Sequence, residues 1–335
     1  MKKTKLYNQF NSVRTKPVNL IAEDVHLFEN EFYKSFEGSY MLYVKNISIN
    51  FLDLSKYFSI MSFSKHTKMK KYNFFKNLKY FYKKSKVIHS DQVFNKGSWI
   101  LDEKSFHYFH WMCDALPRLV QIQGYTEEYP VLIPDKFLKY RFIIESLQKF
   151  EVNYKIYNAS KTLTVKELLI SSHVAPSGNY EKNIMMRIKE VLASKNSDVN
   201  STKIWISREK SKHRKINNEN KLKKILDRYN YQIIYPEDLS FSEQSKIFSK
   251  AKVLAGLHGG GLTNIIYLKD NGILFEIRRE DDADNNCYFT LASELGYKYY
   301  YLNSQKLGND LYIDNVNIDI KDFEKILIKI ENEII

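Results

Sequence analysis

The strongest constraint on the fold is an alternation of short apolar segments with amphipathic ones across the second half of the chain. Four segments have the length and composition of buried strands: 203–207, 231–235, 252–255 and 273–277. The segments between them have helical periodicity, as in the helix predicted from about residue 218. "SFSE" at 240–243 is the capping-box pattern that opens another helix. Repeated strand–helix units predict a parallel sheet.

The length of 335 residues predicts two domains, each large enough to bury its own core. The helical and strand patterns are interrupted at His173–Asn183, where proline, serine and glycine follow one another. We therefore predict an N-terminal domain at 1–178 and a C-terminal domain at 179–317. Residues 318–335 are predicted to form an amphipathic helix that packs back across the domains.

A glycine-rich loop follows the third of these strands. Four of the eleven glycines in the chain lie between Gly256 and Gly261, around His258. Ligands of parallel sheets bind beyond the carboxyl ends of the strands. Glycine lets backbone N–H groups approach an anion, and a following helix offers its positive end. The loop is predicted to bind phosphate with His258 as a further donor; a tight turn around a core histidine is the alternative.

A basic loop follows the first of these strands. "SREKSKHRK" at 207–215 carries five basic residues and one acid, Glu209. Guanidinium groups match phosphate oxygens in a bidentate manner. Because this loop and the glycine loop end strands of one sheet, a diphosphate is predicted to bind between them. A solvated basic loop remains the alternative.

Several named motifs are absent from the chain. The glycine loop lacks the Gly-Lys-Ser/Thr of a P-loop, and Asn264 stands where GxGxxG requires its third glycine. "HGGG" is also found in the oxyanion loop of esterases, but the chain has no Gly-x-Ser-x-Gly. A serine hydrolase is therefore disfavoured.

A third cluster, "HYFHWMCDALPRL" at 107–119, lies in the N-terminal half. On a helix, His110 and Asp114 are i, i+4 neighbours, so the carboxylate could orient the imidazole as a general base. His107 lies on a similar face, which leaves a metal site as a second interpretation. A helix packed through Trp111, with an incidental histidine–aspartate pair, is a third.

The chain is strongly basic, and much of its positive charge lies in one segment. The net charge is +13, and Lys65–Lys86 holds nine lysines, six aromatic residues and no acid. Such a segment suits an anionic membrane surface or a nucleic-acid backbone, or is a solvated helical face. Two distant cysteines, Cys113 and Cys287, are typical of a reducing compartment. With no apolar segment long enough for a signal peptide or a membrane span, the sequence predicts a cytoplasmic protein, peripheral at the inner face of the cytoplasmic membrane if Lys65–Lys86 binds there.

The three clusters, in this order, resemble glycosyltransferase family 61, which includes bacterial capsule and lipopolysaccharide transferases and eukaryotic xylosyl- and N-acetylglucosaminyltransferases. The similar segments are "FHWMCDALPRL", "ISREKSKHRKINNE", "YPEDLSFSEQSKIFSKAKVLAGLHGGGLTNIIYL" and "ILFEI". They extend over about 105–277. Gly260 stands where the family usually has alanine, and the first hundred residues match nothing that we can name.

The resemblance implies an α/β fold of GT-B type, with two Rossmann-like domains facing a central cleft. It implies an inverting transfer of sugar from a nucleotide sugar, by family habit a UDP-sugar, without a required metal or other cofactor. The acceptor would be a hydroxyl of a cell-surface glycan or lipid-linked saccharide, as in capsule or lipopolysaccharide biosynthesis. No nucleic-acid partner is expected.

The resemblance also suggests roles for individual residues. His110 and Asp114 are expected to be catalytic. The residues expected at the donor nucleotide and diphosphate are Arg208, Lys212, Arg214, His258, Gly259, Gly260, Gly261, Thr263, Asn264 and Glu276. Residues with an acceptor or structural role nearby are His107, Trp111 and Arg118.

Two other functions remain open from the sequence. One is another polysaccharide-modifying transferase of GT-B-like fold, such as a pyruvyl or glycerol-phosphate transferase. The other is a basic nucleic-acid-binding protein that uses Lys65–Lys86, although the chain has no recognisable helix-turn-helix, RRM or KH signature.

Overall fold

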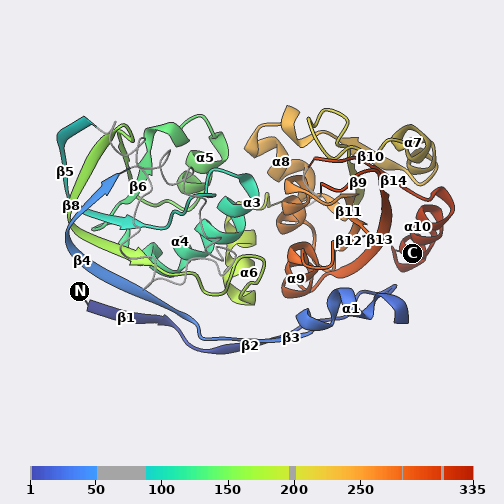
Figure 1. Ribbon diagram of the computed structural model, residues 1–335, viewed down its shortest axis with the longest axis horizontal. Coiled ribbons are helices and arrows are strands. Elements are labelled where there is room, and N and C mark those ends of the chain that lie inside the picture. The colour runs from blue at the N-terminus through green and yellow to red at the C-terminus, as the bar shows by residue number, and fades with distance from the viewer. Residues whose placement is uncertain (1, 51–87, 196–200, 281, 311–312, 335) are drawn as a thin grey trace. The chain divides into compact units, whose positions relative to one another are not determined.

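The computed structural model describes residues 2–50, 88–195, 201–280, 282–310 and 313–334 (Figure 1). The chain forms two compact units. The first consists of Met1–Asn11 and Ser35–Val191, and the second of Ser12–Lys34 and Leu192–Ile335. This division differs from the predicted domains in two ways: the first unit extends beyond residue 178, and residues 12–34 belong to the second.

The first unit is built on a six-stranded mixed sheet. In spatial order its strands are β1 (Lys2–Tyr7), β4 (Ser39–Asn50), β8 (Lys161–Ser171), β5 (Ile88–Trp99), β6 (Val131–Pro134) and β7 (Tyr154–Tyr157). β1, β4 and β8 pair antiparallel, whereas β8, β5, β6 and β7 pair parallel. The sheet is therefore parallel over β8, β5, β6 and β7, and antiparallel where β1 and β4 join it.

A helix with a widened turn carries the third sequence cluster. α3 (Tyr108–His110) continues through a π-helical turn, η4 (Trp111–Ala115), into α4 (Leu116–Ile122). Pro117 has no N–H with which to bond the carbonyl of Cys113, so a regular α-helix cannot continue there. The other helical segments of this unit are η5 (Gln123–Tyr125), η6 (Asp135–Phe137), α5 (Arg141–Lys149) and α6 (Lys182–Leu192).

The second unit contains the predicted parallel sheet. Its strands, in spatial order, are β10 (Tyr231–Ile234), β9 (Thr202–Ile206), β11 (Ala251–Leu257), β12 (Ile273–Arg279), β13 (Lys298–Lys306) and β14 (Val316–Asn317). The first five pair parallel, and β14 pairs antiparallel with β13. An α/β fold is therefore confirmed, with every strand predicted between residues 203 and 277 present.

Helices cover both faces of this sheet. They are α7 (Glu219–Arg228), η7 (Pro236–Asp238), α8 (Phe241–Phe248), η8 (Gly260–Tyr267), α9 (Cys287–Glu294) and α10 (Ile320–Ile334). The predicted capping box opens α8, with Ser240 and Glu243 bonding reciprocally. Figure 1 shows α7 and α10 on one side of the sheet and α8 and α9 on the other.

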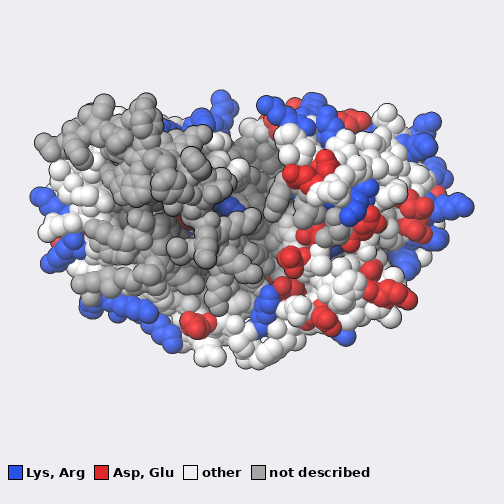
Figure 2. Space-filling model, viewed as in Figure 1, with Lys and Arg blue, Asp and Glu red and all other residues white. Residues whose placement is uncertain are grey.

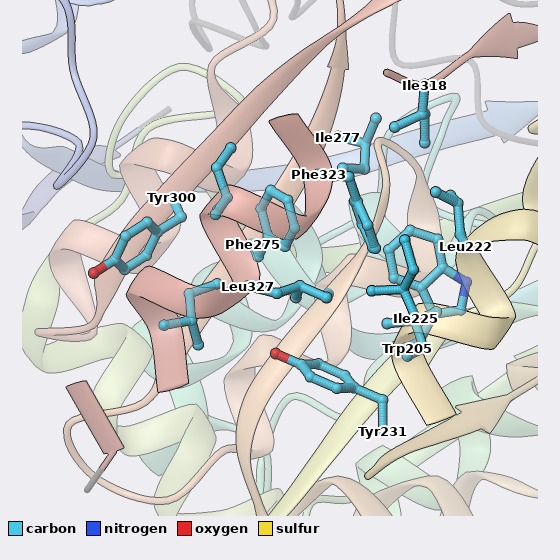
Figure 3. Close-up of a cluster of buried hydrophobic side chains, with 14 of the residues drawn as sticks. Trp205, Leu222, Ile225, Tyr231, Phe275, Ile277, Tyr300, Ile318, Phe323 and Leu327 are labelled. Atoms are coloured by element: carbon cyan, nitrogen blue, oxygen red, sulfur yellow. The ribbon is translucent and has the colours of Figure 1, made fainter. Parts of the chain in front are cut away.

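The face under α7 and α10 is an apolar core (Figure 3). Phe275 and Ile277 of β12 meet Trp205 of β9 and the helical residues Leu222 and Phe323 there. All five side chains are buried. The C-terminal helix is thus a structural part of the second unit, held by apolar burial.

The opposite face of β12 is polar although it is also buried. Side chains alternate along a strand, so Glu276 and Arg278 point away from Phe275 and Ile277. Their relative exposures are only 0% and 2%. A buried charge is tolerated only when it is paired and hydrogen-bonded, which makes this face the place to look for function.

The segment Ser12–Lys34, which we call the strap, belongs to the second unit. It includes the end of β2 (Phe10–Val13) and the start of β3 (Tyr33–Phe36), which pair as a two-stranded ribbon, and the chain between them. Its helical segments are η1 (Ala22–Asp24), α1 (Val25–Phe28) and η2 (Glu29–Glu31). Figure 1 shows α1 beside α9 and β13.

The predicted membrane-contact segment, Lys65–Lys86, lies outside the described residues, so that interpretation stays a prediction. Among the helices that are described, none has the length and apolar character needed to span a bilayer. On the face of the second unit seen in Figure 2, acidic and basic side chains are interspersed, and no continuous basic surface is present there.

Candidate active site

The glycine loop turns at the carboxyl end of β11. Gly259 has φ +157°, and helix η8 begins at the next residue. A Cβ at Gly259 would lie 2.3 Å from Nη1 of Arg208, whereas one at Gly260 would meet nothing within 4 Å. The absence of a side chain at Gly259 is therefore what admits the guanidinium group against the backbone.

Arg208 and Arg214 both approach this glycine. Arg208 folds the basic loop around itself, because its Nε donates to the carbonyl of Arg214 at 2.9 Å and its Nη2 to Ser211 at 3.1 Å. Nη2 of Arg214 would lie 3.7 Å from a Cβ at Gly259. Burial, together with the charge of Arg214, lowers the pKa of Arg208 to about 10. The guanidinium groups of Arg208 and Arg214 thus both lie beside Gly259, although they carry like charges.

Two other charged residues of the basic loop have partners of opposite charge. Lys210 pairs with Asp238, and Glu209 pairs with Lys223 at 2.5 Å. By contrast, no carboxylate among the described residues lies within ion-pair distance of Arg208 or Arg214. The Nε of Arg214 is buried and has no hydrogen-bond partner within the described chain.

Arg214 is also held in an unfavourable backbone conformation. Its φ of +54° lies in the left-handed region, which costs a non-glycine residue roughly 1–2 kcal/mol. The backbone N–H of Arg214 bonds to the carbonyl of Ile313 at 3.0 Å, which supports this conformation. Strain of this kind clusters at functional sites.

His258 is engaged on both ring nitrogens. Its Nδ1 lies 2.5 Å from Oε1 of Glu276, and the amide nitrogen of Asn285 lies 2.8 Å from Nε2. Because the amide donates to Nε2, the ring hydrogen is on Nδ1 and is donated to the carboxylate. Tyr299 donates to Oε2 of Glu276 at 2.6 Å.

The carboxylate of Glu276 is stabilised as an anion. Burial acts to raise its pKa, but its interactions with His258 and Arg278 and the hydrogen bond from Tyr299 hold that pKa below the ordinary value. Burial and Glu276 raise the pKa of Tyr299 well above its ordinary value. His258 therefore does not present a free N–H to a ligand in this structure; it links the glycine loop to β12.

Thr263 and Asn264 are fully buried. The side chain of Asn264 donates to Gln244 and to the carbonyl of Gly261, both at 3.1 Å. Tyr288 donates to the carbonyl of Gly259 at 2.7 Å. These contacts support the shape of the loop from within, whereas Lys212 is exposed at the surface.

In the first unit the predicted histidine–aspartate pair is present. Nδ1 of His110 lies 2.7 Å from Oδ2 of Asp114, and Ser177 donates to the same oxygen at 2.8 Å. Asp114 is 3% exposed, while the imidazole is partly accessible. Because the carboxylate accepts from Nδ1, the basic nitrogen of the ring is Nε2.

The other residues of this cluster are structural in their contacts. Trp111 is fully buried and donates to Ser146 at 2.8 Å. Arg118 is fully buried and donates from Nε to the carbonyl of Ser171 at 2.7 Å. Burial lowers the pKa of Arg118 to about 10, although Asp102 and Asp114 act in the opposite direction.

His107 lies at the surface, and its ring centroid is 6.3 Å from that of His110. Burial of part of the ring and the neighbouring His110 lower the pKa of His107. Nowhere in the described parts of the chain do three histidine, cysteine, aspartate or glutamate side chains gather as a metal site would require. The metal-site interpretation of this cluster gains no support.

Residues 108–274, about half of the chain, match the family model described as Glycosyltransferase 61. The chain belongs to glycosyltransferase family 61. The matched segment contains the His110–Asp114 pair, the basic loop and the glycine loop. The family resemblance noted in the sequence is thus confirmed.

The curated relatives that match the chain are also named as sugar transferases. The EGF domain-specific O-linked N-acetylglucosamine transferase of Drosophila melanogaster is 30% identical over 134 residues, which cover 36% of this chain and 25% of that protein. The protein of that name from Gallus gallus is 27% identical over 145 residues, covering 36% and 26%. The chain spans about a quarter of the length of these relatives.

Several residues of this glycosyltransferase 61 chain were not recognised from the sequence as parts of the site. They are Ser177 beside Asp114, and Tyr299, Asn285 and Arg278 around His258 and Glu276. The one available signal in the sequence was the presence of charged residues within the strand "ILFEIRR". In the structure all seven residues of this strand are buried.

Proposed function

We propose that this chain is an inverting glycosyltransferase that moves a sugar from a nucleotide sugar to a hydroxyl group of a glycan or lipid-linked acceptor. Family membership supports the transfer of sugar. The convergence of Arg208 and Arg214 on Gly259, without carboxylate partners in the described chain, is the observation that carries the donor assignment. Guanidinium pairs of this kind are suited to a diphosphate.

The chemistry proposed is a single displacement. Nε2 of His110 takes the proton of the acceptor hydroxyl while that oxygen bonds to the anomeric carbon. The bond from this carbon to the diphosphate oxygen breaks, and the nucleoside diphosphate leaves with the electron pair. Attack opposite the leaving group inverts the anomeric centre.

Asp114 orients the base in this proposal. It accepts the Nδ1 hydrogen of His110 and is itself held by Ser177, so the imidazole keeps its basic nitrogen at Nε2. A positioned general base typically contributes about 10²–10⁴-fold to the rate. Asp114 is buried and accepts hydrogen bonds from both His110 and Ser177, which supports His110 rather than Asp114 as the base.

Charge on the leaving diphosphate is met by Arg208, Arg214 and the first amides of η8. The first N–H groups of a helix lack carbonyl partners within it, so they can bond an anion. Donors that are oriented before the reaction stabilise developing charge most effectively. We propose that these cations serve where other transferases use a metal, so that no metal is required.

The choice of nucleotide and sugar is based on the family and on the names of the relatives. UDP is the first nucleotide to test because it is usual in the family, and N-acetylglucosamine is the first sugar because the relatives are named for it. We propose surface polysaccharide, of capsule or lipopolysaccharide type, as the acceptor. A cytoplasmic location, at the membrane if Lys65–Lys86 binds it, completes the proposal.

The donor assignment is tested by thermal unfolding with a panel of nucleoside mono- and diphosphates, nucleotide sugars and phosphoenolpyruvate. At 100 times its Kd a ligand adds roughly 2.7 kcal/mol to the stability of the form that binds it. We expect a diphosphate to stabilise the protein more than its monophosphate. A response to phosphoenolpyruvate alone, or to none of these ligands, would contradict the proposal.

The stereochemistry is tested separately, by NMR of the product. Starting from an α-linked nucleotide sugar, a β-linked product is expected. An α-linked product would exclude the single displacement even if the donor is correct.

A further inference from the structure

The strap is bonded to the edge of β13. The backbone N–H of Val18 donates to the carbonyl of Tyr299 at 2.9 Å. Asn19 bonds both to the N–H and to the carbonyl of Tyr301, at 3.1 and 2.8 Å. Asp24 accepts from the hydroxyl of Tyr301 at 2.6 Å. These contacts fix the position of α1 against the polar face of the sheet.

Phe28, at the end of α1, covers Arg278. The guanidinium carbon of Arg278 lies 4.9 Å from the centroid of this ring, and both residues are buried. A cation over an aromatic face is stabilised most when both are removed from water. Beside it, the carbonyl of Leu27 accepts from the amide of Asn286 at 2.8 Å.

Arg278 connects the strap to both partners of His258. Its Nη1 donates to Asn286 at 2.8 Å and lies 3.5 Å from the hydroxyl of Tyr299, which in turn donates to Glu276. Its Nη2 donates to the carbonyl of Asp282 at 2.7 Å. Through Tyr299, Arg278 is linked to Glu276, which accepts from Nδ1 of His258. Through Asn286 and Asp282, it is linked to the loop that carries Asn285, which donates to Nε2 of His258.

We propose that the strap is a positioning element of the diphosphate site, and that Phe28, packed on Arg278, keeps the hydrogen of His258 on Nδ1. The consequence for ligand binding rests on the proposed function, because His258 lies next to Gly259 in the glycine loop. Phe28 touches no ligand in this proposal. It acts through Arg278 on the orientation of Glu276 and Asn285.

Two replacements in the strap form a matched pair. Phe28→Leu removes the ring that covers Arg278. Phe32→Leu removes a ring of the same strap that packs on Phe289, 6.3 Å between centroids, without covering Arg278. Phe28→Met, whose flexible unbranched side chain also lacks an aromatic face, replaces the leucine variant if the latter does not fold.

The first test observes His258 itself. The protein is labelled with [15N]histidine, and the ring resonances of His258 are identified by their loss in His258→Gln. The ring nitrogens are expected to shift in Phe28→Leu towards exchange between the two tautomers, and to stay in place in Phe32→Leu. Unchanged resonances in Phe28→Leu would overturn the proposal, as would an equal shift in both variants.

The second test measures UDP affinity by titration calorimetry. Phe28→Leu should weaken binding by about 5–30-fold, the range expected for a coupling of one to two kcal/mol, and Phe32→Leu by much less. In a Glu276→Gln background the effect of Phe28→Leu should be clearly smaller, because one of the two paths from Arg278 to His258 runs through Glu276. A full additional loss in that background would mean general loosening and would refute positioning through Glu276.

The two tests separate the two proposals. If the wild-type protein binds no nucleoside diphosphate, the proposed function is wrong, and the resonances of His258 still decide whether the strap positions it. If UDP binds and the resonances do not respond to Phe28→Leu, the proposed function stands and the role of the strap is refuted.

Discussion

Nδ1 of His110 lies 2.7 Å from Oδ2 of Asp114, and the same oxygen accepts the hydroxyl of Ser177. The carboxylate is buried and the imidazole is partly accessible. This relationship leaves Nε2 of His110 as the nitrogen that can accept a proton. It occurs in a helix that widens into a π-turn, a feature often found at functional sites.

Changes at this pair should lower turnover without lowering donor affinity. His110→Ala removes the base. In Asp114→Asn, an amide that donates to Nδ1 would force the ring hydrogen to Nε2, so the base is blocked. Each variant is expected to lose about 10²–10⁴-fold in kcat. His107→Ala, which removes the neighbouring exposed imidazole, is the control with a smaller effect; full activity in Asp114→Asn would contradict the assignment.

The glycine loop offers a second matched pair. Gly259→Ala places a Cβ 2.3 Å from Nη1 of Arg208 and should displace that group. Loss of one charge-assisted hydrogen bond predicts a nucleoside-diphosphate Kd about 10–100-fold higher. Gly260→Ala meets no neighbour and should have a much smaller effect. Titration calorimetry measures both, and equal affinities for the two variants would show that Arg208 does not need this space.

Charges within the basic loop should differ in their effect on binding. Arg208→Ala and Arg214→Ala each remove a cation that has no acidic partner in the described chain, and we expect Kd for the diphosphate to rise about 10–100-fold. Lys210→Ala removes a cation of the same loop that is already paired with Asp238. Its effect should stay within about threefold, because exposed ion pairs contribute little. The assignment fails if Lys210→Ala is as damaging as Arg208→Ala.

Acid should destabilise the protein partly through Glu276. Its pKa is lowered in the folded state from 4.5, so its contribution is complete above about pH 4.5 and is lost as the pH falls below that value. One group of this kind adds at most about 1.4 kcal/mol per pH unit to the slope of stability. Urea denaturation between pH 3 and 6 should show a shallower dependence in Glu276→Gln. The exposed Glu29→Gln is the control, and an unchanged slope in Glu276→Gln would refute the prediction.

The C-terminal helix provides a test of packing. Leu327 is fully buried in the apolar core, whereas the adjacent Ile328 is 46% exposed. Leu327→Ala should lower the free energy of unfolding by about 2–5 kcal/mol, and Ile328→Ala by less than about 0.5 kcal/mol. Similar losses in both would mean that α10 is not packed as the structure has it.

Much of the second unit follows from local sequence. The periodicity around Leu222 and Leu226, the capping box at Ser240 and the loop after β11 each depend on residues a few positions apart. Such signals place strands and helices correctly because they reflect backbone geometry and one-sided burial. The convergence of Arg208 with the glycine loop also followed, since parallel strands end at one edge of a sheet.

The sequence by itself determined the α/β alternation and the spacing of His110 and Asp114. It also placed Arg208 and Arg214 in a loop beside the glycine turn, at one edge of the sheet. Only the tertiary structure decided that a side chain at Gly259 would strike Arg208, that Asn285 and Glu276 occupy both nitrogens of His258, and that Phe28 covers Arg278. The physical reason is that a buried charge must find its partners wherever the fold brings them. Residues 12–34 and 278–303 meet across a long interval of sequence, and no local pattern records such a contact.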